Sequence, residues 1–189
     1  WRHPLGSEAK CAYLSGPRAE IVNLMIYPRN AQQVPVFAVE LILYGQIPRV
    51  AVVDLQAVEG VESALAGQVV EALLEKGAPF RQRLSPGGEL PPWALPHFTS
   101  AAIYSRPQTL AELAPLLGGY RLFLKTWRDQ FFPRESNQAS SQQEMRHYQK
   151  HHVENTPGRR FLHTSFGESW SEQYLSEFMY CQGLRDGLQ

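Results

Sequence analysis

Apolar stretches bounded by glycine and proline dominate the first third of the chain. Four runs are rich in apolar and β-branched residues, and only a few residues separate each run from the next. This pattern is typical of β-strands. Such short connections favour antiparallel neighbours, because a parallel pair needs a crossover of about a dozen residues or more. We therefore predict an antiparallel meander with strands at residues 10–16, 20–27, 34–44 and 49–55.

The spacing of apolar positions changes to that of a helix in the next segment. Val and Leu recur at helical spacing over residues 58–76, and Gly77 follows as a stop signal. A second helix is predicted over 109–132, where Thr109 and Glu112 have capping-box spacing and Gly118-Gly119 favours a break.

The remaining segments are assigned by composition and spacing. The patterns predict an irregular loop at 78–96, a further strand at 98–104, a polar mobile stretch at 134–144, a polar helix at 142–153 and a last, aromatic-rich helix at 165–180. A sheet followed by helices is typical of an α+β fold. Neither a repeat nor a domain boundary is evident, so we expect one domain over residues 1–189. Because the chain begins at Trp1 and not at Met, we expect part of the N-terminus to be lacking.

Composition narrows the possible classes of protein. The 18 basic and 18 acidic side chains give a formal net charge of 0, which does not favour nucleic acid or an anionic membrane as a partner. The longest apolar run, 34–44, is interrupted by Glu40 and is too short to cross a bilayer. Two distant cysteines, Cys11 and Cys181, suggest free thiols in a reducing compartment. Neither GxGxxG, GxxxxGK[ST], GxSxG nor HExxH occurs, so flavin, nicotinamide and nucleotide sites are not indicated.

Glu40 is the residue that most needs an explanation, because it lies within a strand that is otherwise apolar on both faces. An unpaired buried carboxylate costs several kcal/mol, so such a site either pairs the charge or raises the pKa. A carboxyl group with a raised pKa holds a proton near neutral pH and serves as a general acid. Two simpler interpretations are that Glu40 faces solvent or pairs with Arg49 across the hairpin.

Three other polar features have both a functional and a structural interpretation. Asn23, in a similar apolar strand, is either a hydrogen-bonding ligand contact or a satisfied structural amide. Asp54, at a strand end, is more typical of a turn or cap carboxylate. The basic segment 146–152, followed by Arg159 and Arg160, is either an anion-binding surface or a plain solvated helix. Its spacing does not by itself indicate a metal site, and we expect none.

Several motifs occur in an order that resembles the ferredoxin-dependent bilin reductases. These are Asn23-Leu-Met-Ile-Tyr-Pro-Arg29, Val34-Pro-Val-Phe-Ala-Val-Glu-Leu41, Val50-Ala-Val-Val-Asp-Leu-Gln56, Glu89-Leu-Pro-Pro-Trp93, Arg159-Arg-Phe-Leu162 and Phe166-Gly-Glu-Ser-Trp170 with Tyr174. Each motif is weak alone, but together they cover most of residues 9–180. The resemblance implies a three-layer α/β/α sandwich with a central antiparallel sheet and a bilin between the sheet and the C-terminal helices. It also implies single electrons from reduced ferredoxin, radical intermediates, and no bound flavin or metal.

The resemblance also assigns roles to residues. Glu40 falls where the family usually has a catalytic Asp, and the related red chlorophyll catabolite reductases have Glu in a comparable strand. Asn23 falls at the catalytic His of the phycocyanobilin-forming members, and other members have Asn there. Cys11 replaces a Glu of the phycocyanobilin type. Thr156 stands where several phycoerythrobilin-pathway members carry a second Asp, which puts A-ring reduction in doubt.

The binding residues follow from the same resemblance. Arg49 occupies a position that contacts a propionate. The further candidates for binding the bilin or ferredoxin are Lys150, His152, Arg160 and Phe161, together with Thr156.

We therefore expect ferredoxin-dependent reduction of biliverdin to a phytobilin such as 15,16-dihydrobiliverdin. The expected enzyme is a monomer, in the bacterial cytoplasm or the plastid stroma, without a membrane or nucleic-acid partner. A second hypothesis is a reductase of another linear tetrapyrrole, such as a chlorophyll catabolite. A third is a non-catalytic bilin-binding protein, and a fourth is an unrelated structural domain.

Overall fold

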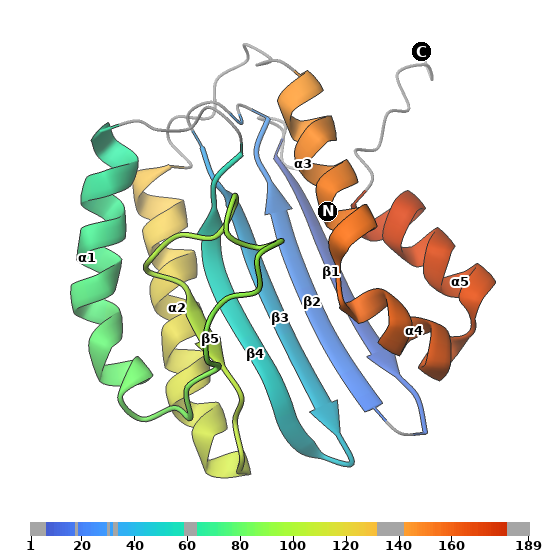
Figure 1. The fold of residues 1–189 in the computed structure, drawn as a ribbon. Coiled ribbons are helices and arrows are strands. Elements are labelled where there is room, and N and C mark those ends of the chain that lie inside the picture. Colours follow the sequence, from blue (N-terminus) through green and yellow to red (C-terminus); the bar gives the residue numbers. More distant parts are fainter. Residues whose placement is uncertain are drawn as a thin grey trace.

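A computed structural model describes residues 7–17, 19–29, 31, 34–58, 64–131 and 142–180. Its centre is a five-stranded antiparallel sheet in which neighbours in the chain are also neighbours in the sheet (Figure 1). The first four strands confirm the predicted meander. The strands are β1 (Glu8–Ser15), β2 (Ala19–Tyr27), β3 (Val36–Tyr44), β4 (Ile47–Gln56) and β5 (Ile103–Ser105).

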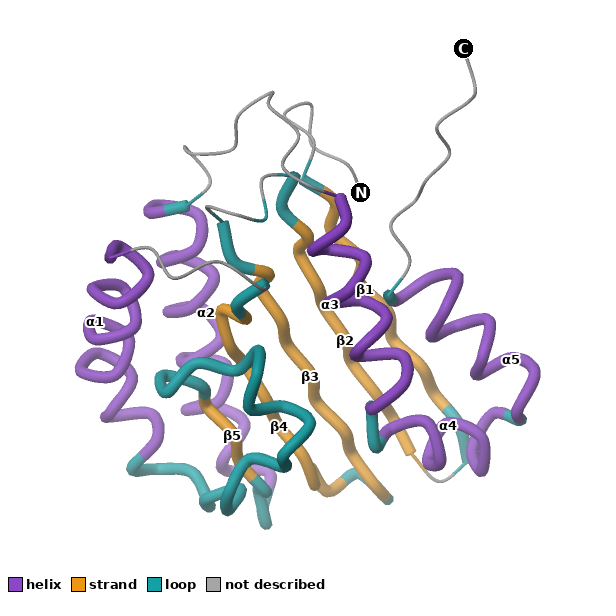
Figure 2. The backbone as a smooth tube through the Cα atoms, turned by 45° about the horizontal axis from the view of Figure 1, so that its top comes forward, coloured by secondary structure: helices purple, strands orange, loops and turns teal. Residues whose placement is uncertain are grey.

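Helices cover both faces of the sheet, which confirms the three-layer arrangement. One face packs against α1 (Ala64–Arg81) and α2 (Leu113–Gln130), the latter preceded by a 3-10 turn, η1 (Leu110–Glu112). The other face packs against α3 (Gln142–Asn155), α4 (Gly158–Phe166) and α5 (Glu168–Gln173), which continues as the π-helical segment η3 (Tyr174–Met179). Figure 2 shows that the long loop between α1 and β5 lies on the same side of the sheet as α3.

Helices bury both faces of the sheet at β3, which explains why this strand is almost entirely apolar. Successive side chains of a strand point to opposite faces. Phe37 and Val39 pack with α1 and α2, whereas Val36 and Ala38 belong to the core beneath α3–α5. A strand covered on both faces is expected to be continuously apolar. Glu40, the exception, therefore shares the face of Ala38.

Helix α1 extends past Gly77, so the predicted stop there was wrong. The helix continues to Arg81 despite Pro79. The Arg81 guanidinium donates hydrogen bonds to the carbonyls of Leu73, at 3.2 Å, and Ala101, at 2.9 Å. A Cβ at position 77 would lie 2.8 Å from Arg81 Nη1, so glycine makes room for this side chain instead of ending the helix.

The two glycines of α2 allow other side chains to pack closely against the helix. The helix break predicted at Gly118-Gly119 is not found, since α2 is continuous there. A Cβ at Gly118 would lie 2.3 Å from the Phe80 ring, and one at Gly119 would lie 2.6 Å from Ile103 Cδ1. The Glu112 part of the predicted capping box is confirmed, since its carboxylate accepts hydrogen bonds from the Thr109 and Gln108 amides.

The C-terminal helical region differs from the prediction of one helix at 165–180. Gly167, at φ +87°, separates α4 from α5 and adopts a conformation that favours glycine. The start of α4 at Gly158 was not predicted, and the predicted strand at 98–104 is reduced to the three residues of β5. Most of the predicted mobile stretch, residues 134–141, lies outside the described residues. Among the described helices, none is both long and apolar enough to cross a membrane.

Candidate functional site

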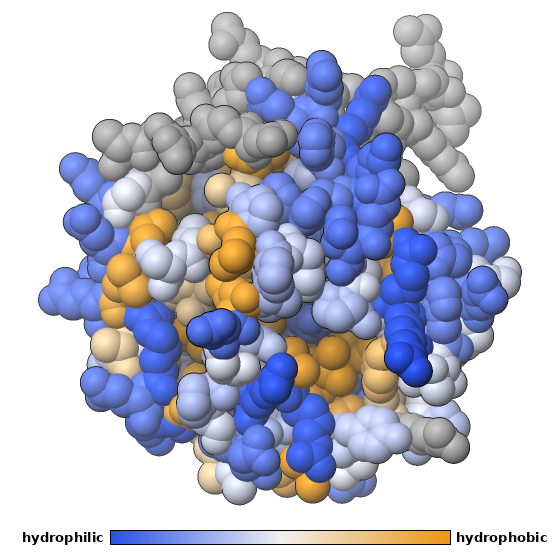
Figure 3. Space-filling model, in the orientation of Figure 1, coloured by the Kyte–Doolittle hydropathy of each residue, from blue (hydrophilic) through white to orange (hydrophobic). Residues whose placement is uncertain are grey.

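A cavity of about 470 Å³ lies between the sheet and the layer formed by the loop after α1, α3 and α4. Side chains of β2, β3 and β4 that face α3–α5 form its floor, and apolar residues predominate among those that line it. Figure 3 shows apolar side chains in a hollow on this face of the molecule, surrounded by hydrophilic ones. Such a concave, mostly apolar cavity with few polar groups is typical of a small-molecule site.

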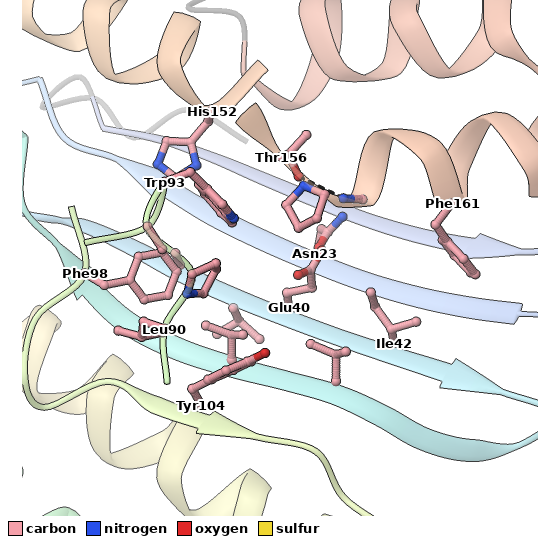
Figure 4. A pocket seen from close by; sticks show the side chains of 18 of the residues that line it. Asn23, Glu40, Ile42, Leu90, Trp93, Phe98, Tyr104, His152, Thr156 and Phe161 are labelled. Carbon is pink, nitrogen blue, oxygen red and sulfur yellow. Dashed lines mark hydrogen bonds between the residues drawn. The ribbon is translucent and has the colours of Figure 1, made fainter. Parts of the chain in front are cut away.

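Glu40 and Asn23 lie together on the cavity floor. The strand register places Asn23 of β2 opposite Glu40 of β3, and Glu40 opposite Val52 of β4. Side chains at directly opposite positions are neighbours on the same face of a sheet. Figure 4 shows both near the middle of the cavity, between Trp93 and His152 on one side and Ile42 and Phe161 on the other.

The Glu40 carboxyl group is partly buried and accepts no hydrogen bond from the residues that the structure describes. Burial disfavours the ionised form and raises its pKa to about 7. The alternative interpretation, a pairing of Glu40 with Arg49, is not found in the described structure, where Val52 is opposite Glu40. From the other side of the sheet, Tyr120 Oη donates a hydrogen bond to the backbone carbonyl of Glu40 at 3.0 Å, which fixes this part of β3.

Asn23 is held by the C-terminal layer. Its Nδ2 donates a hydrogen bond of 2.9 Å to the Tyr174 hydroxyl of η3, a contact that the sequence did not reveal. The Asn23 Oδ1 has no partner among the described residues, so it remains able to accept a hydrogen bond from a ligand N–H. Asn23 is therefore both tied to the helices and directed to the cavity.

Replacing Tyr174 with Phe is expected to lower the free energy of unfolding by about 0.5–1.5 kcal/mol, because it removes this hydrogen bond and leaves the half-buried amide unpaired. Urea unfolding of the variant measures the loss. Tyr13→Phe is the control, since Tyr13 is exposed on β1. Equal stability of wild type and Tyr174→Phe would contradict a stabilising role for the contact.

Two arginines line the cavity, of which only Arg49 was predicted from the sequence. Arg49 reaches the lining because a bulge between Ile42 and Leu43 shifts the register of β3 and β4 at this point. Arg106 follows β5 and also lines the cavity, next to the Tyr104 hydroxyl. Nothing in the local sequence distinguishes Arg106 from an ordinary surface cation, since only the pairing of β4 with β5 brings it here.

The candidates on α3, on α4 and in the turn between them divide into two groups. His152, Thr156 and Phe161 line the cavity. Lys150 and Arg160 do not, since both are exposed, and Lys150 forms a 3.8 Å ion pair with Glu154. For these two residues a contact with ferredoxin stays a prediction, and their placement does not support a contact with a buried ligand.

His152 is buried and has no charge to offer a ligand. Desolvation, together with the nearby His97 and His151, lowers its pKa to about 3. Its ring stacks on Tyr180 and meets Trp93 edge-on. A neutral imidazole forms hydrogen bonds, but it does not pair as a cation with a propionate.

Asp54 and Cys11 lie away from the cavity lining. Asp54 is fully buried beneath the loop, where its carboxylate accepts hydrogen bonds from the Thr99 amide at 2.7 Å and the Thr99 hydroxyl at 2.5 Å. This contact supports the structural interpretation of Asp54 as a carboxylate that fixes a loop. Cys11 is exposed on β1, and Cys181 lies outside the described residues. Within the described ranges, we find no group of three side chains arranged to hold a metal ion.

Comparison with known proteins identifies the family. The model of the ferredoxin-dependent bilin reductases matches residues 8–180. The phycoerythrobilin:ferredoxin oxidoreductase of Nostoc punctiforme is 24% identical over 180 residues, which cover 92% of this chain and 70% of the relative. The phycocyanobilin:ferredoxin oxidoreductase of Gloeobacter violaceus is 25% identical over 172 residues, which cover 87% of this chain and 65% of the relative.

A solved structure supports the same fold. The tomato phytochromobilin synthase, crystallised in complex with biliverdin, superimposes with a TM-score of 0.76 over 93% of this chain and 68% of that protein, at 15% identity. This likeness shows the α/β/α sandwich, and the match of the family model over nearly the whole chain shows the family. The chain belongs to the ferredoxin-dependent bilin reductases.

Proposed function

We propose that this protein reduces biliverdin to 15,16-dihydrobiliverdin with electrons from reduced ferredoxin. The reaction adds two electrons, one at a time, and two protons across the methine bridge between two rings. Family membership supports the reaction class and the electron donor. The observation that carries the proposal is Glu40, a carboxyl group with a pKa of about 7 on the floor of a largely apolar cavity.

Glu40 supplies one of the two protons to the reduced pigment in this proposal, and solvent water supplies the other. The first electron makes the bilin more negative, and a low-dielectric cavity increases the affinity of that species for a proton. Near pH 7 a substantial share of Glu40 is protonated. The position directly opposite it on β2 carries no competing acid, because Asn23 cannot donate a carboxyl proton. Asn23 orients the pigment by accepting a hydrogen bond from a ring N–H.

The cavity offers few charges to a bilin with two propionates. Among the described residues that line it, Arg49 and Arg106 are the cations, and we assign both to the propionates. Thr156 lines the cavity but has a hydroxyl, which is a poor general acid. Among the described residues that line the cavity, Glu40 is the one with a carboxyl group, and we therefore propose a single two-electron reduction at the 15,16 position.

Turnover is expected to fall as pH rises above about 7. Glu40 must hold a proton to act as an acid, and the protonated fraction falls about tenfold per pH unit above its pKa of about 7. The rate constant for loss of the biliverdin absorption band, measured anaerobically from pH 5.5 to 9 with saturating ferredoxin, tests this. A rate that stays level from pH 6 to 9 would exclude Glu40 as the proton donor in the limiting step.

The decisive first experiment is an absorption spectrum of the protein with biliverdin, before and after reduced ferredoxin is added without oxygen. Loss of the biliverdin band with growth of a band at shorter wavelength is expected, and chromatography of the product identifies the reduced position. A stable coloured complex whose spectrum does not change would instead indicate a bilin-binding protein without reductase activity.

Glu40 also motivates a second candidate function, reduction of another linear tetrapyrrole such as a chlorophyll catabolite. Competition between biliverdin and that catabolite, in binding and in turnover, distinguishes the two.

We further propose that the protein acts as a monomer, in the bacterial cytoplasm or the plastid stroma. Sedimentation of the purified chain tests its oligomeric state.

A further inference from the structure

Two buried polar atoms at one end of the cavity have no hydrogen-bond partner among the described residues. They are Nε1 of Trp93, on the loop after α1, and Nε2 of His152, on α3. Both side chains line the cavity, and their ring centroids are 5.7 Å apart with an interplanar angle of 85°. His152 is only 3% exposed. Because an unpaired buried polar atom is costly, two neighbouring ones on a cavity wall point to a ligand.

The surrounding residues hold these two rings in place. The carbonyl of Trp93 accepts a hydrogen bond of 2.7 Å from His151 Nε2, which ties the loop to α3. His152 stacks on Tyr180 at 5.3 Å and contacts the rings of His97 and Tyr148. Figure 4 shows the indole of Trp93 directed toward the middle of the cavity, where Asn23 and Glu40 lie. The pair is therefore positioned before any ligand binds.

The chemistry of the two atoms selects the kind of group that they bind. The indole N–H is always a donor, and a neutral imidazole has one nitrogen that accepts. His152 is neutral in this environment, since its pKa is lowered to about 3. With the His152 proton on Nδ1, Nε2 is the accepting nitrogen, and the pair then offers one donor and one acceptor and no charge. A carboxylate would leave the acceptor unsatisfied, whereas a lactam carries a carbonyl acceptor beside an N–H donor.

Trp93 and His152 also lie at a different position along the strands from the guanidinium of Arg49. His152 contacts Tyr148, whose hydroxyl bonds Gln56 at one end of β4. Arg49 lies near the other end of the same strand, beyond Val50, which pairs with Ile42. Glu40 lies between, opposite Val52. A linear pigment along the strands would place a terminal ring at Trp93 and His152, apart from the guanidinium of Arg49.

We propose that Trp93 Nε1 and His152 Nε2 bind the lactam of a terminal ring of the bilin, with Trp93 donating to the carbonyl oxygen and His152 accepting from the ring N–H. This inference rests on the proposed function, because it takes a bilin as the ligand. In this proposal Trp93 and His152 are positioning residues, because their contacts with the terminal ring fix the position of the pigment along the strands. Their position in turn decides which carbon lies above Glu40.

Replacing Trp93 with Phe tests the proposal, because it removes the N–H and keeps an aromatic ring. Titration of the protein with biliverdin, followed by its absorption, is expected to show affinity reduced by about 3- to 20-fold. The Tm of the ligand-free variant should equal or exceed that of wild type, because the indole N–H is unpaired there. Trp170→Phe, at an exposed tryptophan outside the cavity lining, should bind as wild type does.

Two modified pigments make the test specific to the lactam. Biliverdin with its terminal lactams O-methylated lacks the N–H and the carbonyl, so wild type and Trp93→Phe should bind it equally. Biliverdin dimethyl ester keeps the lactams and masks the propionates, so the loss caused by Trp93→Phe should persist. His152→Phe should behave like Trp93→Phe with all three pigments.

The outcomes separate this inference from the proposed function. An unchanged affinity of Trp93→Phe for biliverdin, or an equal loss with the O-methylated pigment, would overturn the lactam assignment while leaving the reductase proposal intact. Failure of the wild type to bind any of the pigments would overturn the proposed function itself. Binding with the expected pattern, but without reduction by ferredoxin, would support the lactam site in a protein that is not a reductase.

Discussion

Replacing Glu40 with Gln is expected to reduce turnover of biliverdin by about 10²–10⁴-fold, the usual contribution of a general acid. Gln has nearly the same size and remains polar, so the pigment should still bind with an affinity within about threefold of wild type. Electrons would still arrive from ferredoxin, but the reduced pigment would lack its proton donor. A bilin radical should therefore accumulate, which rapid-mixing absorption and electron paramagnetic resonance under anaerobic conditions would detect.

Two further variants make this prediction specific to the acid. Glu40→Asp keeps a carboxyl group and moves it by one methylene, so it should retain much more activity than Glu40→Gln. Glu20→Gln makes the same chemical change on β2 at a residue outside the cavity lining, and should act as wild type. Full turnover by Glu40→Gln, or equal losses in the Gln and Asp variants, would exclude the proton-donor role.

Replacing Asp54 with Asn is expected to stabilise the protein above pH 7 and to have little effect below pH 4. Burial outweighs the hydrogen bonds from Thr99 and raises the pKa of Asp54 from 3.8 to about 7. Between these values the unfolded chain loses the proton while the folded state keeps it, so the wild type loses stability as pH rises. The loss reaches a plateau on the order of 4 kcal/mol above pH 7.

The Asn side chain should fit the same contacts, with its oxygen accepting from the Thr99 amide and its nitrogen donating to the Thr99 hydroxyl. Urea unfolding of both proteins at pH 4, 5.5 and 7.5 measures the difference. Asp129→Asn is the control with the opposite sign: its exposed carboxylate has a lowered pKa through hydrogen bonds from Lys125 and Arg128. A difference between wild type and Asp54→Asn that does not change with pH would contradict the titration of Asp54.

The sheet could be predicted from the sequence because its rules are local. The four strands between residues 8 and 56 are bounded by glycine and proline. The short connections between them allow only antiparallel pairing. The helix ends were harder, because Gly77, Gly118 and Gly119 meet side chains that are distant in the sequence or across a turn. A glycine selected for close packing looks the same in a sequence as one that ends a helix.

The candidate site was predicted in part for the same reason. Glu40 and Asn23 interrupt apolar strands, which makes them visible in the sequence. Arg106, Trp93 and Tyr174 reach the site only through the pairing of β4 with β5, the fold of the loop and the packing of η3. The basic stretch 146–152 suggested an anion-binding surface or a solvated helix. In the structure His152 is buried and neutral, whereas Lys150 is exposed.

The meander also has a consequence for the order of folding. Every pairing among β1–β4 joins segments that are neighbours in the chain, so little loop-closure entropy opposes their formation. By contrast, the contact between Asn23 and Tyr174 spans 151 residues. The floor of the cavity is therefore expected to form early in folding, and its roof of C-terminal helices to dock last. Amide protons in α4 and α5 should then exchange through smaller openings than those of β2 and β3, and a bound pigment should slow the exchange of the roof most.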